Sequence, residues 1–385
     1  MHNAPDTRPH ILLVGGDGHP SGVPRHICDL ARALQGQARI TVASEADAGG
    51  YHELAQYGAR HVALHGLASR LNPAAVRAGK RALLSLLQQE SPDIVWLHAR
   101  LPVLLGRQLL ASGDWCPRPG TRIALTYHGL PFGPGHRRST ALVSKRIERS
   151  LLSQCPPLDL VFLSAEQQQI MTRALGGSLQ PHRAHVLGNA SCLGPLPAPD
   201  RRDIPGRHLV MTGRCGFQKN YEAALRLMRH LPDDITLSLC GFGTDRPAFR
   251  EQVSKLAGTA APRIRCLGPL PDIRPLMAAA DGYMLLSRYE GMPIGALEAC
   301  EAGLPLILAD FNGSADLLEG LPIGLRLTQK KPEAQARRID GVLTRYLSDR
   351  DGLSSSIRAH WAKRWSSDAF DAQARTLVAG WLEGP

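Results

Sequence analysis

The chain has 385 residues, of which 43% are apolar and 21% are charged, and this length predicts two domains that can each bury a full core. The ordinary apolar content and the lack of a short repeat exclude collagen, coiled coil and intrinsic disorder. Lys and Arg number 45 against 34 Asp and Glu, a net charge of +11, and this balance favours polyanionic neighbours such as nucleic acid, acidic lipid or phosphorylated metabolites.

The first half of the chain alternates short strand-like runs with longer amphipathic segments. We expect helices over residues 23–34 and 73–89, the second with Asn72 as N-cap and Pro73 at its first position. We expect strands at residues 10–15, 39–44, 60–64, 93–98, 122–128, 159–164 and 185–187. Alternation of this kind predicts βαβ units and a parallel sheet covered by helices on both faces.

A second series of the same kind follows residues 188–207, which are rich in Pro and Gly and lack periodicity. Its strands are expected at residues 209–212, 235–240, 264–267, 283–286 and 306–309. The economical interpretation is two doubly wound α/β domains, 1–190 and 208–365, joined by a linker at 191–207. A terminal helix of about 366–385 could return to the first domain.

The cysteines and the termini bear on the compartment. The eight cysteines are scattered without a metal-binding spacing, which indicates thiols in a reducing compartment. The chain shows no export signal and no stretch as long as a spanning helix, so we expect a cytoplasmic protein. A predicted helix at 136–149 is rich in Arg and Lys; a solvated face is the favoured interpretation, and shallow contact with an acidic membrane through Leu142, Val143 and Ile147 is the alternative.

In open parallel sheets, ligands bind beyond the carboxyl ends of the strands. Residues 287–305, SRYEGMPIGALEACEAGLP, leave one such strand and enter a helix. Pro293 suits the helix start, and the free N–H groups of Ile294 and Gly295 would form an anion site there. Glu290 and Glu298 stand eight positions apart, a pattern that suits hydroxyls flanking a phosphate, although the spacing alone favours ordinary surface carboxylates.

Residues 211–220, MTGRCGFQKN, form a second such strand exit. Gly213 ends the strand, Arg214 and Lys219 flank a small loop, and Asn220 is expected to cap the next helix. Two cations beside a helix start would clamp a diphosphate. Taken alone, this is as well explained by a solvated basic loop; beside the first motif, the functional interpretation is favoured.

Together these motifs resemble the retaining nucleotide-sugar glycosyltransferases of the GT-B fold, in particular family four. The resemblance rests on G-R-x4-K at Gly213, Arg214 and Lys219, and on Glu-x7-Glu from Glu290 to Glu298. The G-x-G turn at 241–243 and the strand-end histidine of TYHG also fit. It implies two Rossmann-like domains facing across a cleft, with the acceptor on the first and the donor on the second.

The resemblance also implies residue roles. Arg214 and Lys219 would neutralise the donor diphosphate, Glu298 would hold the ribose, and Glu290 would bind the transferred sugar. His128 would line the reactive face of the sugar. Backbone contacts to the donor are expected from Gly22, Gly213, Gly241, Gly243, Gly291, Met292, Ile294 and Gly295.

The implied reaction moves a sugar from a nucleotide-diphosphate sugar to a glycan, lipid-linked or other acceptor, in surface polysaccharide or glycoconjugate biosynthesis. We expect no cofactor and no metal, since the one D-x-D sequence, at 349–351, lies in a late polar turn. The sequence departs from the family pattern at Pro24, Cys192 and Asp316, which puts acceptor or capping contacts at Pro24 in doubt.

Three other functions were weighed. A GT-B epimerase or hydrolase would use the same donor site without an acceptor. A nucleic-acid-binding protein fits the net charge, but the sequence has no helix-turn-helix, no zinc spacing and only 5% aromatic residues. An NAD-dependent oxidoreductase ranks low because the opening GGDGHPSG lacks the G-x-G-x-x-G fingerprint.

Overall fold

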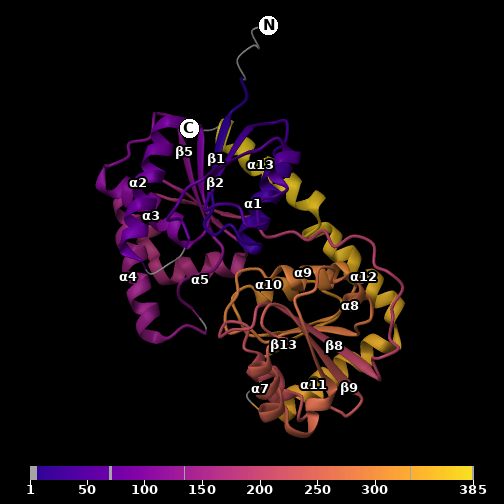
Figure 1. The fold of residues 1–385 in the computed structure, drawn as a ribbon. Coiled ribbons are helices and arrows are strands. Elements are labelled where there is room, and N and C mark those ends of the chain that lie inside the picture. Colours follow the sequence, from indigo (N-terminus) through magenta and orange to yellow (C-terminus); the bar gives the residue numbers. More distant parts are fainter. Residues whose placement is uncertain (1–6, 69–71, 134, 330, 384–385) are drawn as a thin grey trace. The chain divides into compact units, whose positions relative to one another are not determined.

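The computed structural model describes residues 7–68, 72–133, 135–329 and 331–383 (Figure 1). The chain divides into two compact units. Unit 1 takes in the described residues up to 133, together with 137–190 and the chain from Ser367 onward; unit 2 takes in residues 191–366 and the short segment before Arg137. Each unit is described by itself.

Unit 1 is built on a seven-stranded sheet in the order β3-β2-β1-β4-β5-β6-β7, and every pair in it is parallel. Its strands are β1 (His10–Val14), β2 (Arg39–Ser44), β3 (Arg60–Ala63), β4 (Ile94–Leu97), β5 (Arg122–Tyr127), β6 (Asp159–Phe162) and β7 (Arg183–Val186). Its helices are α1 (Gly22–Ala33), α2 (Pro73–Glu90), α3 (Arg100–Ser112), α4 (Arg138–Gln154), α5 (Ala165–Leu175) and α13 (Ser367–Glu383), with 3-10 turns η1 (Leu54–Tyr57) and η2 (Gly176–Leu179).

The central strand β1 is buried on both faces, and its side chains alternate between two apolar clusters. Leu12 and Val14 point into one cluster, and Ile11 and Leu13 point into the other. Burial on both faces explains why this strand is a continuous apolar run in the sequence. The Asn72 cap is confirmed, because its Oδ1 accepts hydrogen bonds from the Ala74 and Ala75 amides at 3.0 and 3.3 Å.

The C-terminal helix α13 belongs to unit 1, where it packs against α1 (Figure 1). Arg32 of α1 forms an ion pair with Asp371 at 3.0 Å, and Arg375 donates a hydrogen bond to the Ala33 carbonyl at 2.7 Å. The ring of Trp381 stands edge-on to Trp96 of β4, with the ring centroids 4.7 Å apart. The last helix therefore completes the core of the unit that contains the start of the chain.

Unit 2 contains a six-stranded parallel sheet in the order β10-β9-β8-β11-β12-β13. Its strands are β8 (Arg207–Thr212), β9 (Ile235–Cys240), β10 (Ile264–Gly268), β11 (Gly282–Leu285), β12 (Leu306–Ala309) and β13 (Gly324–Leu327). Its helices are α6 (Tyr221–Leu227), α7 (Pro247–Ala257), α8 (Arg274–Ala278), α9 (Ile294–Glu301), α10 (Ser314–Leu318), α11 (Pro332–Ser348) and α12 (Arg350–Arg364), with the 3-10 turn η3 (Gly258–Arg263).

The two doubly wound parallel sheets expected from the sequence are confirmed. Strand β13 is absent from our sequence-based assignment; it is a short edge strand that follows a Gly- and Pro-containing turn, so its apolar alternation is brief. Asp349 of the D-x-D sequence accepts a hydrogen bond from the Gly352 amide at 3.2 Å and caps α12. Among the described residues, no helix is long and apolar enough to cross a membrane.

Candidate active site

In unit 2, two glycine turns bring the exits of neighbouring strands into contact. Gly213 follows β8 with φ +139°, and Gly241 follows β9 with φ +141°, values that favour glycine. A Cβ atom on Gly241 would lie 2.1 Å from the Gly213 carbonyl oxygen, and one on Gly213 would lie 2.5 Å from Cε of Lys219. Both positions therefore require glycine, and the Lys219 side chain passes directly over the first turn.

The Glu290 carboxylate, in the loop after β11, is the centre of a hydrogen-bond network. Its Oε1 accepts hydrogen bonds from Nζ of Lys219 at 2.8 Å and from the hydroxyl of Ser287 at 2.6 Å. Its Oε2 accepts one from Nε2 of Gln218 at 3.1 Å. The side chains of Lys219 and Glu290 are only 18% and 7% exposed. The network fixes the orientation of the Glu290 carboxylate, and the Lys219 ammonium compensates its buried negative charge.

The loops after β8 and β11 are also joined through their backbones. The Arg288 amide donates to the Gln218 carbonyl at 2.8 Å, and the guanidinium of Arg288 lies 4.1 Å from the centroid of the Phe217 ring. Asn220 occupies the N-cap position of α6, as expected, but its side chain does not cap the helix. Its φ of +53° is left-handed, and its amide instead donates to the Leu286 carbonyl at 3.0 Å.

The start of α9 lies at the same edge of the sheet. Pro293 precedes the helix, and within the described residues the amides of Ile294 and Gly295 have no hydrogen-bond acceptor. A Cβ atom on Gly295 would approach Thr212 Oγ1 of β8 to 2.4 Å, so the helix start is pressed against the end of that strand. Free N–H groups at the positive end of a helix dipole form an anion site.

The other residues of unit 2 predicted to bind the sugar donor lie in the loops and helix around this network. Gly291 and Met292 are buried in the loop before α9, and Glu298 is half-buried on the helix. Gly243 has φ +90° in the turn after β9. Arg214 is exposed and, within the described part of the chain, forms no hydrogen bond or ion pair, so the cation joined to Glu290 is Lys219 and not Arg214.

In unit 1, three histidines gather at the carboxyl edge of the sheet. His98 follows β4 and His128 follows β5, and these strands are neighbours. His98 Nδ1 lies 3.2 Å from His128 Nε2, and the ring of His26, from α1, stands edge-on to His128 with centroids 5.0 Å apart. Nδ1 of His26 lies 2.9 Å from Oδ1 of Asn189, so it is the donor of that bond.

Burial keeps these imidazoles neutral. Desolvation lowers the pKa of His26 to about 4, against a smaller opposing effect of its hydrogen bond to Asn189. The pKa values of His98 and His128 lie well below the usual value, first because of burial and second because of the neighbouring histidines. A neutral His128 offers the site a hydrogen bond and not a positive charge.

The hydrogen bond between His98 and His128 also bears on which nitrogen of His128 carries its proton. His98 is fully buried, and its Nε2 has no partner among the described groups. A buried N–H without an acceptor is costlier than a lone pair without a donor. The favoured arrangement therefore has His98 Nδ1–H donating to His128 Nε2, which leaves the proton of His128 on Nδ1.

The sequence analysis assigned a site role to His128 but none to His98 or His26. The strand ends after β4 and β5 were visible in the sequence, but that these strands are neighbours was not. Gly22 is the exposed first residue of α1, and Pro24 in the same turn is buried. In the described ranges, no three His, Cys, Asp or Glu side chains are placed to hold a metal ion.

Comparison with known families accounts for both units. Residues 20–191 match the family described as Glycosyltransferase Family 4, and residues 203–359 match the family described as Glycosyl transferases group 1. The chain is a GT-B glycosyltransferase of the family-four type.

Two relatives are similar to this chain at 29% identity. An Escherichia coli UDP-Gal:alpha-D-GlcNAc-diphosphoundecaprenol alpha-1,3-galactosyltransferase is 29% identical over 255 residues, which cover 62% of this chain and 63% of that protein. A Rhizobium leguminosarum lipopolysaccharide core biosynthesis mannosyltransferase, LpcC, is 29% identical over 312 residues, with coverages of 72% and 85%. The matched part of the first relative is thus less than two thirds of its length.

Solved structures share the GT-B fold at low identity. Anabaena HepE in complex with UDP and glucose superposes with a TM-score of 0.74 at 16% identity and covers 97% of this glycosyltransferase and all of that chain. Sucrose-phosphate synthase from Thermosynechococcus elongatus superposes with a TM-score of 0.76, also at 16% identity, with coverages of 97% and 99%. At this identity the likeness shows the fold alone.

Proposed function

We propose that this glycosyltransferase moves a sugar from a nucleotide-diphosphate sugar to a glycan or lipid-linked acceptor, with retention of anomeric configuration and without a metal. The observation that carries the proposal is the pairing of Lys219 with Glu290 beside the free N-terminus of α9. The names of the relatives, which act on a diphosphoundecaprenol-linked sugar and on lipopolysaccharide core, support an acceptor in surface polysaccharide or glycoconjugate biosynthesis. The site of action proposed is the cytoplasm.

The proposed reaction develops charge that the groups of this site could stabilise. As the bond between the anomeric carbon and the diphosphate oxygen breaks, positive charge develops on the carbon and negative charge on the diphosphate. The amides of Ile294 and Gly295, with Lys219 and the exposed Arg214, would hold that negative charge. Removing one such preorganised donor typically costs about 3 kcal/mol of transition-state stabilisation.

In the proposed same-face attack, the acceptor oxygen bonds to the anomeric carbon and its proton passes to the leaving phosphate. This scheme uses no protein nucleophile. The fixed carboxylate of Glu290 would accept a hydrogen bond from a hydroxyl of the transferred sugar, Glu298 would hold the ribose hydroxyls, and His128 would donate from its remaining N–H at the reactive face. Gly22, Gly241 and Gly243 would let the backbone approach the donor.

A panel of UDP-, GDP- and ADP-sugars tests the donor part of the proposal. A donor that binds only the native state raises its melting temperature, so one member of the panel should stabilise the wild type. We expect Lys219→Ala and Glu298→Ala to lose this stabilisation while keeping the wild-type melting temperature within a few degrees. Arg173→Ala, on the exposed surface of α5 in the other unit, is the matched control.

Product analysis separates transfer from the epimerase and hydrolase alternatives. With the stabilising donor alone, a transferase should release free sugar only slowly, whereas fast release of sugar or conversion of the donor would identify the alternatives. Normal turnover by Lys219→Ala or Glu298→Ala would contradict the proposed site.

A further inference from the structure

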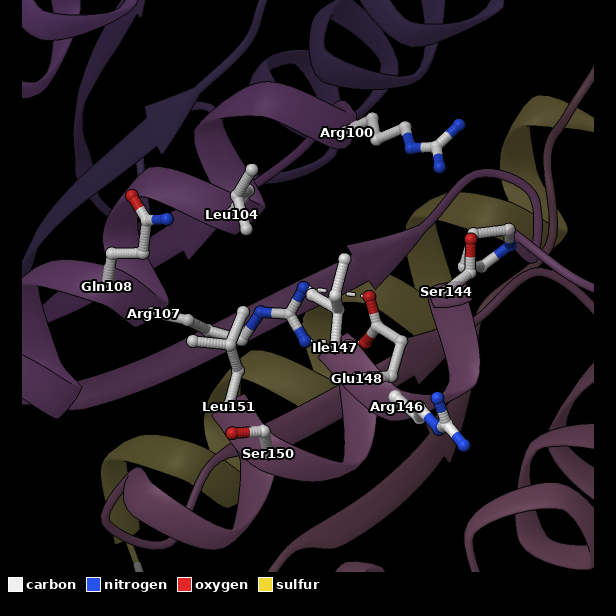
Figure 2. Close-up of a pocket in the computed structure, with 11 residues that line it drawn as sticks. Arg100, Leu104, Arg107, Gln108, Ser144, Arg146, Ile147, Glu148, Ser150 and Leu151 are labelled. Atoms are coloured by element: carbon white, nitrogen blue, oxygen red, sulfur yellow. Dashed lines mark hydrogen bonds and ion pairs between the residues drawn. The ribbon is translucent and has the colours of Figure 1, made fainter. Parts of the chain in front are cut away.

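Unit 1 contains a hollow of about 500 Å³ between α3 and α4 (Figure 2). In Figure 2, Leu104, Arg107 and Gln108 come from α3, and Ser144, Ile147 and Glu148 come from α4. Arg100, Pro131, Arg146 and Leu151 also line the hollow. None of these residues belongs to the donor site of unit 2.

The innermost charges of the hollow neutralise each other. Arg107 donates two hydrogen bonds to Glu148, at 2.5 and 3.0 Å (Figure 2). The Tyr127 hydroxyl donates a third at 3.0 Å. The side chains of Arg107 and Glu148 are only 3% and 9% exposed. This bidentate pair binds the two helices together, and its charges are already occupied.

Two exposed arginines give the lining of the hollow an excess of positive charge. Arg100, at the start of α3, and Arg146, on α4, form no hydrogen bond or ion pair with any described residue, unlike the bonded Arg107. Glu148 supplies the only carboxylate among the lining residues, and Arg107 neutralises it. An anionic group in the hollow would therefore be attracted by the two arginines and would not be repelled by an uncompensated carboxylate of the lining.

The same surface is apolar beside these cations. Leu104, Ile147 and Leu151 line the hollow, and the outer face of α4 exposes Leu142 by 54%, Val143 by 55% and Ile147 by 46%. Ile147 belongs to both surfaces. Helix α4 carries no exposed carboxylate, since its one acidic residue, Glu148, is buried. A basic helix with exposed apolar residues is suited to a membrane interface, where anionic headgroups adjoin hydrocarbon.

Two lining residues of the hollow follow the histidines closely in the chain. Arg100 comes two residues after His98, and Pro131 comes three residues after His128. The loops that place the proposed reactive face thus continue directly into the walls of the hollow.

We propose that the hollow between α3 and α4 binds the phosphate and adjoining hydrocarbon of a membrane-borne, lipid-linked acceptor. Arg100 and Arg146 attract the phosphate, and Leu104, Ile147 and Leu151 contact the start of the chain. Leu142 and Val143 rest at the bilayer surface. That the bound lipid is the acceptor rests on the proposed function. That the hollow binds such a lipid does not.

Vesicle co-sedimentation tests the binding. The protein is mixed with phosphatidylcholine vesicles that contain either a polyprenyl diphosphate or phosphatidylglycerol, adjusted to equal surface potential. We expect tighter binding to the polyprenyl diphosphate vesicles. Each arginine near an anionic surface contributes a factor of about five in affinity, so Arg100→Gln/Arg146→Gln should weaken that binding by about 25-fold, and Arg81→Gln, an exposed arginine of α2 outside the hollow, should not.

A second variant separates the hollow from the general surface. Leu104→Trp adds apolar surface but fills the hollow, so it should weaken binding to the polyprenyl diphosphate vesicles without weakening binding to the phosphatidylglycerol vesicles. Equal binding to the two vesicle types, or unchanged binding in both variants, would overturn the inference in favour of a surface that senses bulk charge. Far-ultraviolet circular dichroism and the melting temperature check that each variant is folded.

Nucleotide-sugar stabilisation, measured on the same variants, keeps this outcome distinct from the donor proposal. The hollow variants should retain the wild-type response to the donor. Loss of donor response in Lys219→Ala with intact vesicle binding would leave the lipid inference standing, and absence of any donor response in the wild type would contradict only the proposed function.

Discussion

Nζ of Lys219 lies 2.8 Å from Oε1 of Glu290, although the two residues are 71 positions apart in the chain. Their loops follow β8 and β11, which are neighbours in the sheet. The ion pair joins the residue proposed to bind the diphosphate to the residue proposed to bind the sugar. The carboxylate therefore attenuates the positive charge that Lys219 can offer to a phosphate.

This relationship predicts opposite effects of two substitutions on binding of the nucleoside diphosphate alone. Lys219→Met should weaken it by about tenfold or more, because a charge-assisted contact is lost. Glu290→Gln should tighten it, because the ammonium is no longer neutralised, while slowing sugar transfer by about 10²–10³-fold. Calorimetric titration with the nucleoside diphosphate of the stabilising donor measures the two changes in binding. Initial rates measure the slower sugar transfer. Weaker binding in both variants would contradict the proposed division of roles.

The histidine pair predicts a defined tautomer. We expect ¹⁵N-detected spectra to show His128 protonated on Nδ1. The protein supplies its own references: His208 Nδ1 lies 3.2 Å from the Ala279 carbonyl and must carry a proton, whereas His182 Nδ1 accepts from the Leu158 amide and its proton is on Nε2.

His98→Gln tests the origin of that tautomer. The variant should give His128 a mixture of tautomers and lower kcat more than it raises KM for the donor, because the hydrogen bond to the reactive face is no longer always available. An unchanged His128 spectrum would show that His98 does not set the tautomer.

Burial of His26 predicts a loss of stability on acidification. Its pKa falls from an ordinary 6.5 to about 4 in the folded protein, so between these pH values the unfolded chain binds the extra proton. The contribution of neutral His26 is present above pH 6.5 and is lost progressively as the pH falls to about 4. It amounts to about 3 kcal/mol at most.

Urea unfolding of the whole chain at a series of pH values measures this contribution. His26→Gln should flatten the pH dependence over this window, and His19→Gln, at an exposed position before α1, should leave it unchanged. An identical slope in His26→Gln and wild type would contradict the expected role of His26.

The pair Arg107–Glu148 predicts non-additive stability effects. Arg107→Met should destabilise the protein by about 3–5 kcal/mol, because among the described residues it leaves the buried Glu148 carboxylate with the Tyr127 hydroxyl as its one donor. Arg107→Met/Glu148→Leu should cost much less, since no uncompensated charge remains. Urea denaturation of both variants measures the difference, and equal costs would show that the pair contributes through packing alone.

Glu301, at the end of α9, anchors the segment that leaves unit 1. Its carboxylate accepts hydrogen bonds from the Ser191 hydroxyl at 2.7 Å and from the Leu193 and Gly194 amides at 2.7 and 2.9 Å. We expect Glu301→Ala to speed hydrogen exchange at these two amides by about tenfold or more, because each loses its acceptor. Exchange at the buried amides of β9 provides the internal control.

Local sequence patterns were enough to predict the fold class and the candidate residues for binding the sugar donor. Buried parallel strands must be apolar on both faces, so runs such as residues 94–97 and 306–309 are visible without tertiary information. Ligand-binding residues follow strand ends in such sheets, and this rule drew attention to Lys219 and Glu290 before any contact was known.

Which of these residues contact one another could not be predicted from local patterns. The order of strands in a parallel sheet is not their order in the chain, so only the fold could place β4 beside β5 and β8 beside β11, and hence His98 against His128 and Lys219 against Glu290. The hollow between α3 and α4 is lined by Arg107 and Glu148, which pair across 41 positions of the chain. Asn220 likewise has a left-handed backbone and donates a hydrogen bond to Leu286, 66 positions away, a contact that no local pattern encodes.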